Sequence, residues 1–161
     1  MKEIQLTQNQ VAIVDDADFE ALNAYKWHAR WNPSTKSFYA QRSVPIGGGK
    51  RTTIQMHRVI TCAQKGFDVD HINKNTLDNS KANMRVCSRS ENGRNRGKQI
   101  DNTSGYKGVD SKNGKWRARI GHLGKKKFLG FFDNILDAAA AYDKAAIEMH
   151  GAFARHNQVA A

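Results

Sequence analysis

The chain has 161 residues, and 26 lysine and arginine residues against 15 aspartate and glutamate residues give it a formal net charge of +11 at pH 7. This length suits one ordinary domain or two small ones, and two small units would each need support from a metal, a ligand or mutual packing. The positive surplus favours a polyanionic partner, because each neutralised phosphate releases condensed counterions. Two cysteines without a paired spacing argue against a disulfide scaffold and against a four-cysteine zinc site. The N-terminus is polar and no apolar run reaches the roughly 18 residues of a membrane span, so we expect a soluble cytoplasmic protein that has no membrane contact.

Residues 1–50 hold short β-type runs that are broken by turn residues at Asn32-Pro33 and at three consecutive glycines from Gly47. The acidic run from Asp15 to Asp18 is compatible with a metal site, but a turn into a short helix, capped by Asp16 or Asp18, is the favoured interpretation. Aromatic side chains also concentrate in this segment, and a small antiparallel core is favoured over a stacking surface for Trp27, Trp31, Phe38 and Tyr39. We therefore expect a β-rich segment that packs on the residues that follow it.

Residues 51–97 contain nearly all the candidate catalytic side chains. Asp70-His71 ends a short β-type run, and a carboxylate beside an imidazole supplies an oxygen ligand for a hard cation and a nitrogen base. A loop rich in Asn and Asp follows, and then a second β-type run over residues 84–87. Ser88 and Glu91 form an S-x-x-E capping box, which predicts a helix that starts at Ser88 and has Asn92 in its first turn. The predicted order is strand, loop, strand and helix.

Two simpler interpretations compete with a catalytic one. An isolated Asp-His pair near a strand end is usually an ordinary surface pair, and Asn-rich loops are commonly turns. A zinc set can also be drawn, but the absence of any C-x-x-C unit argues against it; its members would be Cys62, Cys87, His57 and His71.

Taken together, the features of this segment resemble the HNH nuclease motif, in the variant of phage-type homing endonucleases in which the final His is replaced by Asn. The matching residues are His57-Arg58, Asp70-His71, Leu77-Asp78-Asn79, Asn83-Met84-Arg85 and Glu91-Asn92. The resemblance implies a ββα-metal (His-Me finger) nuclease core over residues 51–97, in a protein of phage or bacterial type, with a homing role.

The resemblance also implies a role for each matched residue. His71 would be the general base that takes a proton from the attacking water, while Asp70 and Asn92 would hold one divalent cation at the scissile phosphate. Asn83 would brace the loop and orient His71 through its side-chain amide. Oxygen ligands favour magnesium or manganese, with one ion per active site. For His57, a phosphate contact and a buried, hydrogen-bonded position remain equally open.

Residues 98–103 read as a polar linker, and residues 104–157 as three strands and one helix. The strands are expected at 105–110, 115–121 and 126–132, and the helix at 133–150, where apolar residues repeat at helical spacing up to Gly151. Alternation in the second strand places Lys115, Arg117 and Arg119 on one face and apolar residues on the other. We expect a three-stranded antiparallel sheet that packs on the helix with one face and presents cations to a phosphate backbone with the other.

This C-terminal segment resembles the APETALA2/ethylene-response-factor DNA-binding domain. The resemblance rests on the stretches GYKGV, KWRARI, FLGFF and AAAAYDKAA, on Gly151 and on Asn157. It implies that residues 104–157 bind DNA, whereas Asp110 and Gly121 stand where plant members usually carry Arg, so base preference is not transferable. For Phe128, contact with DNA is favoured over a core position. The expected DNA contacts, with those on or near the nuclease helix, are Arg85, Arg94, Arg96, Lys107, Lys112, Arg117, Arg119, Lys126 and Phe128.

The sequence thus predicts an α+β protein that is a metal-dependent HNH endonuclease and hydrolyses phosphodiester bonds of double-stranded DNA. One active site per chain favours nicking by a monomer. A catalytically inactive DNA-binding regulator of the APETALA2 type is the alternative. A nuclease or binder directed to RNA is a third possibility, because phosphate chemistry does not distinguish the two sugars.

Overall fold

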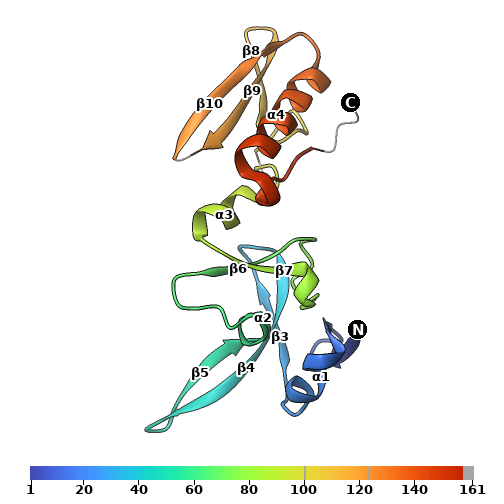
Figure 1. The fold of residues 1–161 in the computed structure, drawn as a ribbon, viewed down its shortest axis with the longest axis vertical. Helices are drawn as coiled ribbons and strands as arrows, with labels where there is room; N and C mark the ends of the chain where they lie inside the picture. The colour runs from blue at the N-terminus through green and yellow to red at the C-terminus, as the bar shows by residue number, and fades with distance from the viewer. Residues whose placement is uncertain (100, 123, 158–161) are drawn as a thin grey trace. The chain divides into compact units, whose positions relative to one another are not determined.

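Two compact units, Met1–Arg89 and Ser90–Ala161, divide the chain in the computed structural model, which describes residues 1–99, 101–122 and 124–157. Both mix short helices with small antiparallel sheets (Figure 1). No helix among the described residues is long and apolar enough to cross a membrane.

The first unit begins with a hairpin of β1 (Lys2–Gln5) and β2 (Val11–Val14), followed by α1 (Asp16–Asn23). A three-stranded sheet of order β3-β4-β5 comes next, from β3 (His28–Asn32), β4 (Ser37–Gly47) and β5 (Lys50–Gln55). The short helix α2 (Met56–Thr61) then leads to a second hairpin of β6 (Asp68–His71) and β7 (Met84–Cys87), and the 3-10 turn Lys81–Asn83 directly precedes β7. This second hairpin carries the Asp-His pair at the end of its first strand.

The predicted cap of α1 is shifted. The helix begins at Asp16, so Asp15 occupies the N-cap position, and the Asp15 side chain makes no capping hydrogen bond. Its Oδ2 instead accepts a hydrogen bond from the backbone N–H of Lys81, at 2.8 Å. The carboxylate at the N-cap position, Asp15, is thus used in a tertiary contact, and neither Asp16 nor Asp18 occupies the predicted cap position.

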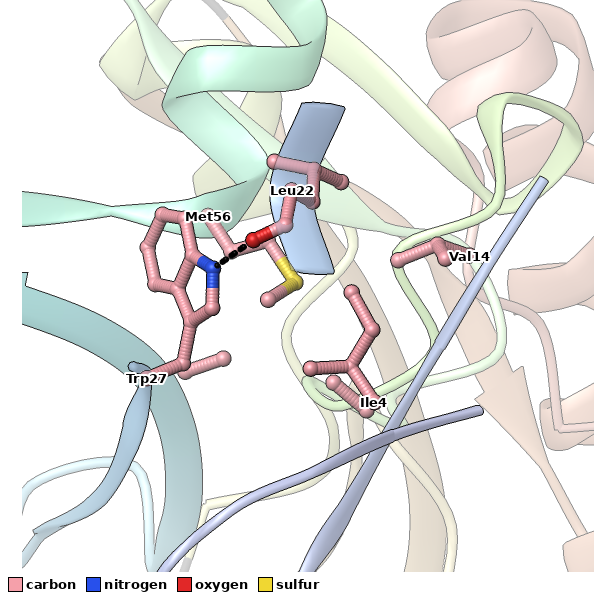
Figure 2. Packing of buried hydrophobic residues seen from close by; sticks show 7 residues of the cluster. Ile4, Val14, Leu22, Trp27 and Met56 are labelled. Carbon is pink, nitrogen blue, oxygen red and sulfur yellow. Dashed lines mark hydrogen bonds between the residues drawn. The ribbon is translucent and has the colours of Figure 1, made fainter. Parts of the chain in front are cut away.

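The core of the first unit brings the N-terminal hairpin, α1 and the start of α2 together. Trp27 is buried and its indole N–H donates to the carbonyl of Leu22 at 2.8 Å, beside the fully buried Met56 (Figure 2). The prediction of a core position is confirmed for Trp27 but is wrong for Trp31, which is 45% exposed and stacks edge-on against Phe38. The cluster comprises Ile4, Ala12, Val14, Leu22, Trp27, Ala40 and Met56.

Helix α3 (Arg89–Arg94) spans the boundary between the two units and begins one residue after Ser88, with Glu91 in its first turn. The second unit then forms a sheet of order β10-β9-β8, from β8 (Val109–Lys112), β9 (Lys115–His122) and β10 (Lys125–Phe132). Helix α4 (Ile135–His150) follows, capped by the Asn134 side chain, which accepts from the backbone N–H of Leu136 at 2.9 Å, and the 3-10 turn Gly151–Phe153 ends the fold.

Alternation along β9 decides which face of this sheet is buried. Ala118 and Ile120 are buried against the alanine-rich side of α4, together with Tyr142, as the sequence predicts. The predicted strand over 105–110 is only partly correct, because β8 begins at Val109. Gly105 and Gly108 have φ values of +80° and +76°, so residues 105–108 turn where an extended strand was expected.

Candidate active site

The β6–β7 hairpin positions the predicted catalytic pair. Its register pairs Asp70 with Arg85 and His71 with Met84, which places both candidates at the end of β6, where each is only 4% exposed. A loop of twelve residues then connects the strands, and it begins with a hydrogen bond from the backbone N–H of Ile72 to the carbonyl of Asn83, at 2.8 Å.

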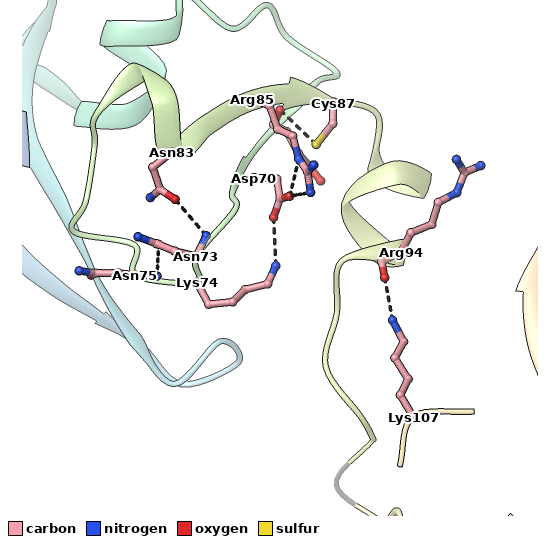
Figure 3. A network of polar contacts seen from close by, with 10 residues as sticks. Asp70, Asn73, Lys74, Asn75, Asn83, Arg85, Cys87, Arg94 and Lys107 are labelled. Atoms are coloured by element: carbon pink, nitrogen blue, oxygen red, sulfur yellow. Dashed lines mark hydrogen bonds and ion pairs between the residues drawn. The ribbon is translucent and has the colours of Figure 1, made fainter. Parts of the chain in front are cut away.

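Asn83 braces this loop from inside. Its Oδ1 accepts from the backbone N–H of Asn73 at 2.9 Å (Figure 3). Its Nδ2 donates to the carbonyl of Asp78 at 2.8 Å. The side chain of Asn73 also donates to the Asp78 carboxylate at 2.8 Å. Both of these Asn83 hydrogen bonds go to loop backbone, and the expected orientation of His71 by Asn83 stays a prediction.

A different amide faces the imidazole. Asn79 is 1% exposed, and its Oδ1 lies 3.4 Å from His71 Nε2. The orientation of this amide is fixed because its Nδ2 donates to the carbonyl of Leu77 at 3.1 Å, which leaves the oxygen for the ring. The backbone of the same loop pairs with β2, with Asn79 N donating to Ile13 O and Ile13 N donating to Leu77 O, both at 2.8 Å. The N-terminal hairpin therefore positions the side chain that binds His71.

Burial decides the charge state of His71. Loss of solvation lowers the pKa of its imidazole below the ordinary value, while the hydrogen bond with Asn79 and the negative charges of Asp70 and Asp78 act in the opposite direction. The ring is therefore neutral at pH 7. Because Asn79 presents an acceptor, the proton lies on Nε2, and Nδ1 keeps its lone pair.

His57 is buried, at 6% exposure, and its ring lies edge-on to that of His71 with a centroid distance of 5.4 Å. Tyr39 completes the cluster, with its ring centroid 5.7 Å from that of His57 and 6.4 Å from that of His71. Burial lowers the pKa of His57 to about 3, and the neighbouring His71 and Arg58 act in the same direction. Of the two alternatives for His57, the structure shows the buried one, although ring contacts rather than hydrogen bonds define its surroundings.

The carboxylate of Asp70 is compensated by two cations. Arg85 donates to Oδ2 from Nε at 2.9 Å and from Nη2 at 2.6 Å, and Lys74 Nζ lies 3.1 Å from Oδ1 (Figure 3). These contacts direct the Arg85 guanidinium at Asp70, and its side chain is 17% exposed. The expected contact of Arg85 with DNA stays a prediction. The sequence did not predict that Arg85 and Lys74 form ion pairs with Asp70.

The remaining nuclease-segment candidates lie in the second unit. Asn92 lies in α3, and its pairing with Asp70 around one cation stays a prediction. The backbone carbonyl of Arg94 accepts from Lys107 Nζ at 2.7 Å, so this contact involves the Lys107 ammonium that was expected at a phosphate. Arg96 is exposed. Among the described residues, no group of three or more His, Cys, Asp or Glu side chains lies close enough to hold a metal.

The second unit presents a face, here called the outer face, made of the side chains that point away from α4. By strand register it carries Lys112, Arg117, Arg119, Lys126 and Phe128, all expected to contact DNA, together with Asp110 and Phe131. Phe128 is 53% exposed and lies beside Phe131, with ring centroids 5.1 Å apart, so the core alternative is excluded for Phe128. A register shift between Phe128 and Gly130 brings these two rings to the same face, a feature that simple alternation does not predict.

Comparisons with known proteins agree with parts of this description. A family model described as HNH endonuclease matches residues 55–94. APETALA2-like protein 2 of Oryza sativa, in both subspecies indica and japonica, is 48% identical over 52 residues, which is 30% of this chain but only 12% of the rice protein. The chain thus spans a small part of those plant proteins.

A phage protein matches over a longer stretch. Protein 3.8 of Escherichia phage T7 is 33% identical over 93 residues, which cover 56% of this chain and 76% of the phage protein. With most of that protein covered at this identity, the chain belongs to the family of phage T7 Protein 3.8, and its residues 55–94 match the HNH endonuclease model.

Proposed function

We propose that the chain is a metal-dependent endonuclease that hydrolyses phosphodiester bonds of double-stranded DNA, with His71 as the general base. The observation that carries this proposal is a neutral, buried imidazole beside a carboxylate at the end of β6, within the segment that matches the HNH endonuclease model. The positive net charge of +11 and the APETALA2-like stretch support a nucleic-acid substrate.

His71 has the properties that proton abstraction needs. With the proton on Nε2 directed at Asn79, Nδ1 is the atom that accepts a proton from the attacking water. A lowered pKa keeps this base unprotonated at pH 7. When the ring becomes positively charged during the reaction, the nearby carboxylates of Asp70 and Asp78 stabilise it.

The donor chemistry fits a hard divalent cation. Asp70 offers a carboxylate and Asn92 an amide oxygen, and both are oxygen donors of the kind that magnesium and manganese accept. These two residues would hold the ion. A bound ion supplies stabilisation of the charge that develops on the phosphate and on the leaving oxygen.

A second function is favoured by one observation. Lys74 and Arg85 form ion pairs with Asp70, and such pairs also suit a carboxylate with a purely structural role. In that case the chain is a DNA-binding regulator of the APETALA2 type, in which the nuclease segment no longer cleaves.

One experiment separates these functions. A pool of supercoiled plasmids with random inserts is incubated with the full chain in magnesium or manganese, and nicked and linear products are scored. We expect nicking by the wild-type chain and by His156→Ala, an exposed-histidine control. We expect His71→Ala to bind DNA normally but to cleave about 100-fold to 10,000-fold more slowly.

Each other outcome has a definite meaning. Cleavage by His71→Ala at the wild-type rate would exclude His71 as the base. Tight, salt-sensitive binding by the wild-type chain with no strand scission in either metal would establish the regulator. A competition between duplex DNA and duplex RNA, run in parallel, tests the choice of sugar.

A further inference from the structure

The outer face of the second unit contains a carboxylate among its cations. Asp110 Oδ1 accepts from Arg117 Nε at 3.0 Å, and Asp110 Oδ2 accepts from Arg117 Nη2 at 2.6 Å and from Arg119 Nη2 at 2.8 Å. Asp110 is paired across the strands with Arg117, and Arg119 is two residues further along the same strand. One carboxylate therefore binds two arginines that were both expected to contact DNA.

This arrangement fixes the directions of both guanidinium groups. A guanidinium is planar and carries five N–H donors, and these bonds use two donors of Arg117 and one of Arg119. The donors that remain can meet acceptors on a ligand. Because the arginines are oriented before binding, less side-chain freedom is lost when a matching ligand arrives.

The same carboxylate changes what the face attracts. Two arginines alone would present two positive charges to any phosphate, whereas the triplet with Asp110 has a net charge of +1. A phosphate that approaches these guanidiniums also meets a negative charge within hydrogen-bond distance of them, and like charges repel. The acceptors on the edge of a base are neutral groups with only partial negative charge, so this repulsion is much weaker for them.

The neighbouring phenylalanines favour the same ligand. Phe128 is paired with Arg119 and Phe131 with Arg117 across the β9–β10 register, and both rings are about half exposed, at 53% and 48%. Apolar rings beside arginines are suited to base edges and to the thymine methyl group, and not to a hydrated phosphate backbone.

We propose that Asp110 is a specificity-determining residue, which orients Arg117 and Arg119 for base edges in a DNA groove and opposes their binding to the phosphate backbone. This inference rests on the proposed binding of duplex DNA. Sequence-independent affinity then comes from the cations outside the triplet, such as the exposed Lys112 and Lys126.

The test compares two charge-matched variants of the full chain in binding buffer without divalent metal. Asp110→Asn removes the carboxylate of the triplet, and Asp133→Asn removes one that is 88% exposed and paired with Lys115 at 3.0 Å. Both raise the net charge by one. Affinity for a pool of random duplexes is measured by fluorescence anisotropy over a range of salt concentrations, and preferred sites are selected from a randomised library.

We expect Asp110→Asn to bind random duplexes roughly fivefold more tightly than the wild-type chain and to show a log–log salt slope steeper by about one. Its selected sites should lose sequence preference. Asp133→Asn should stay within about twofold of wild type and keep the wild-type sites. Asp110→Glu keeps the charge but displaces the arginines, so it should retain the salt slope and still weaken the preference.

The inference is overturned if Asp110→Asn and Asp133→Asn behave alike, or if Asp110→Asn keeps the wild-type site preference. It is also overturned if the wild-type chain shows no preference at all. None of these results touches the nuclease proposal. Absence of any DNA binding by the wild-type chain would instead remove the proposed function itself. Circular dichroism of each variant establishes that it is folded.

Discussion

At the end of β6, two histidines share one buried cluster with Tyr39 but differ in what surrounds them. His71 has Asn79 on its ring and two carboxylates nearby, whereas His57 has an aromatic ring, another imidazole and the positive charge of Arg58. These surroundings make His57 the less basic of the two. Such a ring contributes to stability only while it is neutral.

The first prediction concerns acid stability. His57 has a pKa of about 3 in the folded chain against 6.5 for the free side chain. Its contribution to the free energy of unfolding is therefore complete above pH 6.5 and is lost as the pH falls toward 3. The loss approaches about 1.4 kcal/mol per pH unit. We expect His57→Phe to flatten the fall of the unfolding free energy between pH 6.5 and 4, measured by urea unfolding with tryptophan fluorescence. An equally steep fall in this variant, compared with the exposed-site control His156→Gln, would contradict the assignment.

The second prediction concerns the tautomer of His71. Asn79→Ala removes the acceptor from Nε2, so the proton should distribute between both ring nitrogens, and cleavage should fall by about tenfold or more. Long-range nitrogen–proton spectra of histidine-labelled protein report the tautomer independently of activity. Ser80→Ala is the matched control, because Ser80 is equally buried and its hydroxyl binds Asp78. A wild-type tautomer in Asn79→Ala would show that the amide is merely structural.

Among the elements, β8 depends on the turn before it. Gly108 approaches α4 so closely that an added Cβ would lie 2.1 Å from Tyr142 Cδ2 and 2.6 Å from the carbonyl oxygen of Arg119. The residue before it, Lys107, is held by Asn157, whose Oδ1 accepts a hydrogen bond from the backbone N–H of Lys107 at 2.6 Å. Asn157 is itself held by α4, because its backbone N–H donates to Asp143 Oδ1 at 2.6 Å. The tail after α4 thus stabilises the turn that starts the sheet.

The third prediction follows from this close approach. Gly108→Ala combines a positive φ of +76° with a clash against backbone and a buried ring, so it should destabilise the second unit by roughly 2–4 kcal/mol. Gly114→Ala has nearly the same φ, +75°, but no neighbour within 4 Å, and it should cost only about 1 kcal/mol. Thermal unfolding of the two variants measures the difference. Equal losses would mean that backbone conformation alone matters at Gly108.

For the molecule as a whole, each unit has its own core. The cluster around Trp27 uses buried residues between Ile4 and Met56, whereas the clusters under the C-terminal sheet use buried residues between Val109 and Ala146. The HNH endonuclease match covers residues 55–94 and therefore crosses the boundary at Arg89 and Ser90. The matched segment thus includes residues of both units.

The fourth prediction is that the two cores respond separately. Met56→Ala, at a fully buried position, should lower amide hydrogen-exchange protection in β1–β2 and β6–β7 by an amount that corresponds to roughly 2–5 kcal/mol, while β8–β10 keep theirs. Gly108→Ala should lower the protection of β8–β10 and leave that of β1–β2 and β6–β7 unchanged. Loss of protection throughout the chain in either variant would show that the units unfold together.

Much of the architecture followed from local pattern. Alternation over residues 115–120 and the helical repeat after Asn134 predicted β9 and α4, and the capping box predicted the start of α3, because side-chain periodicity and helix caps depend on near neighbours in the chain. The pattern likewise predicted that Asp70-His71 ends a strand, and both residues lie at the end of β6.

Tertiary structure alone decided which partners these side chains have. Asn79 faces His71 because its loop pairs with β2, more than sixty residues earlier, and Asp110 binds Arg117 and Arg119 because the β8–β9 register places them together. Neither distant backbone pairing nor strand register is encoded in any short stretch of sequence. A hydrogen-bond partner is chosen by position in space, and that position depends on how all the elements pack.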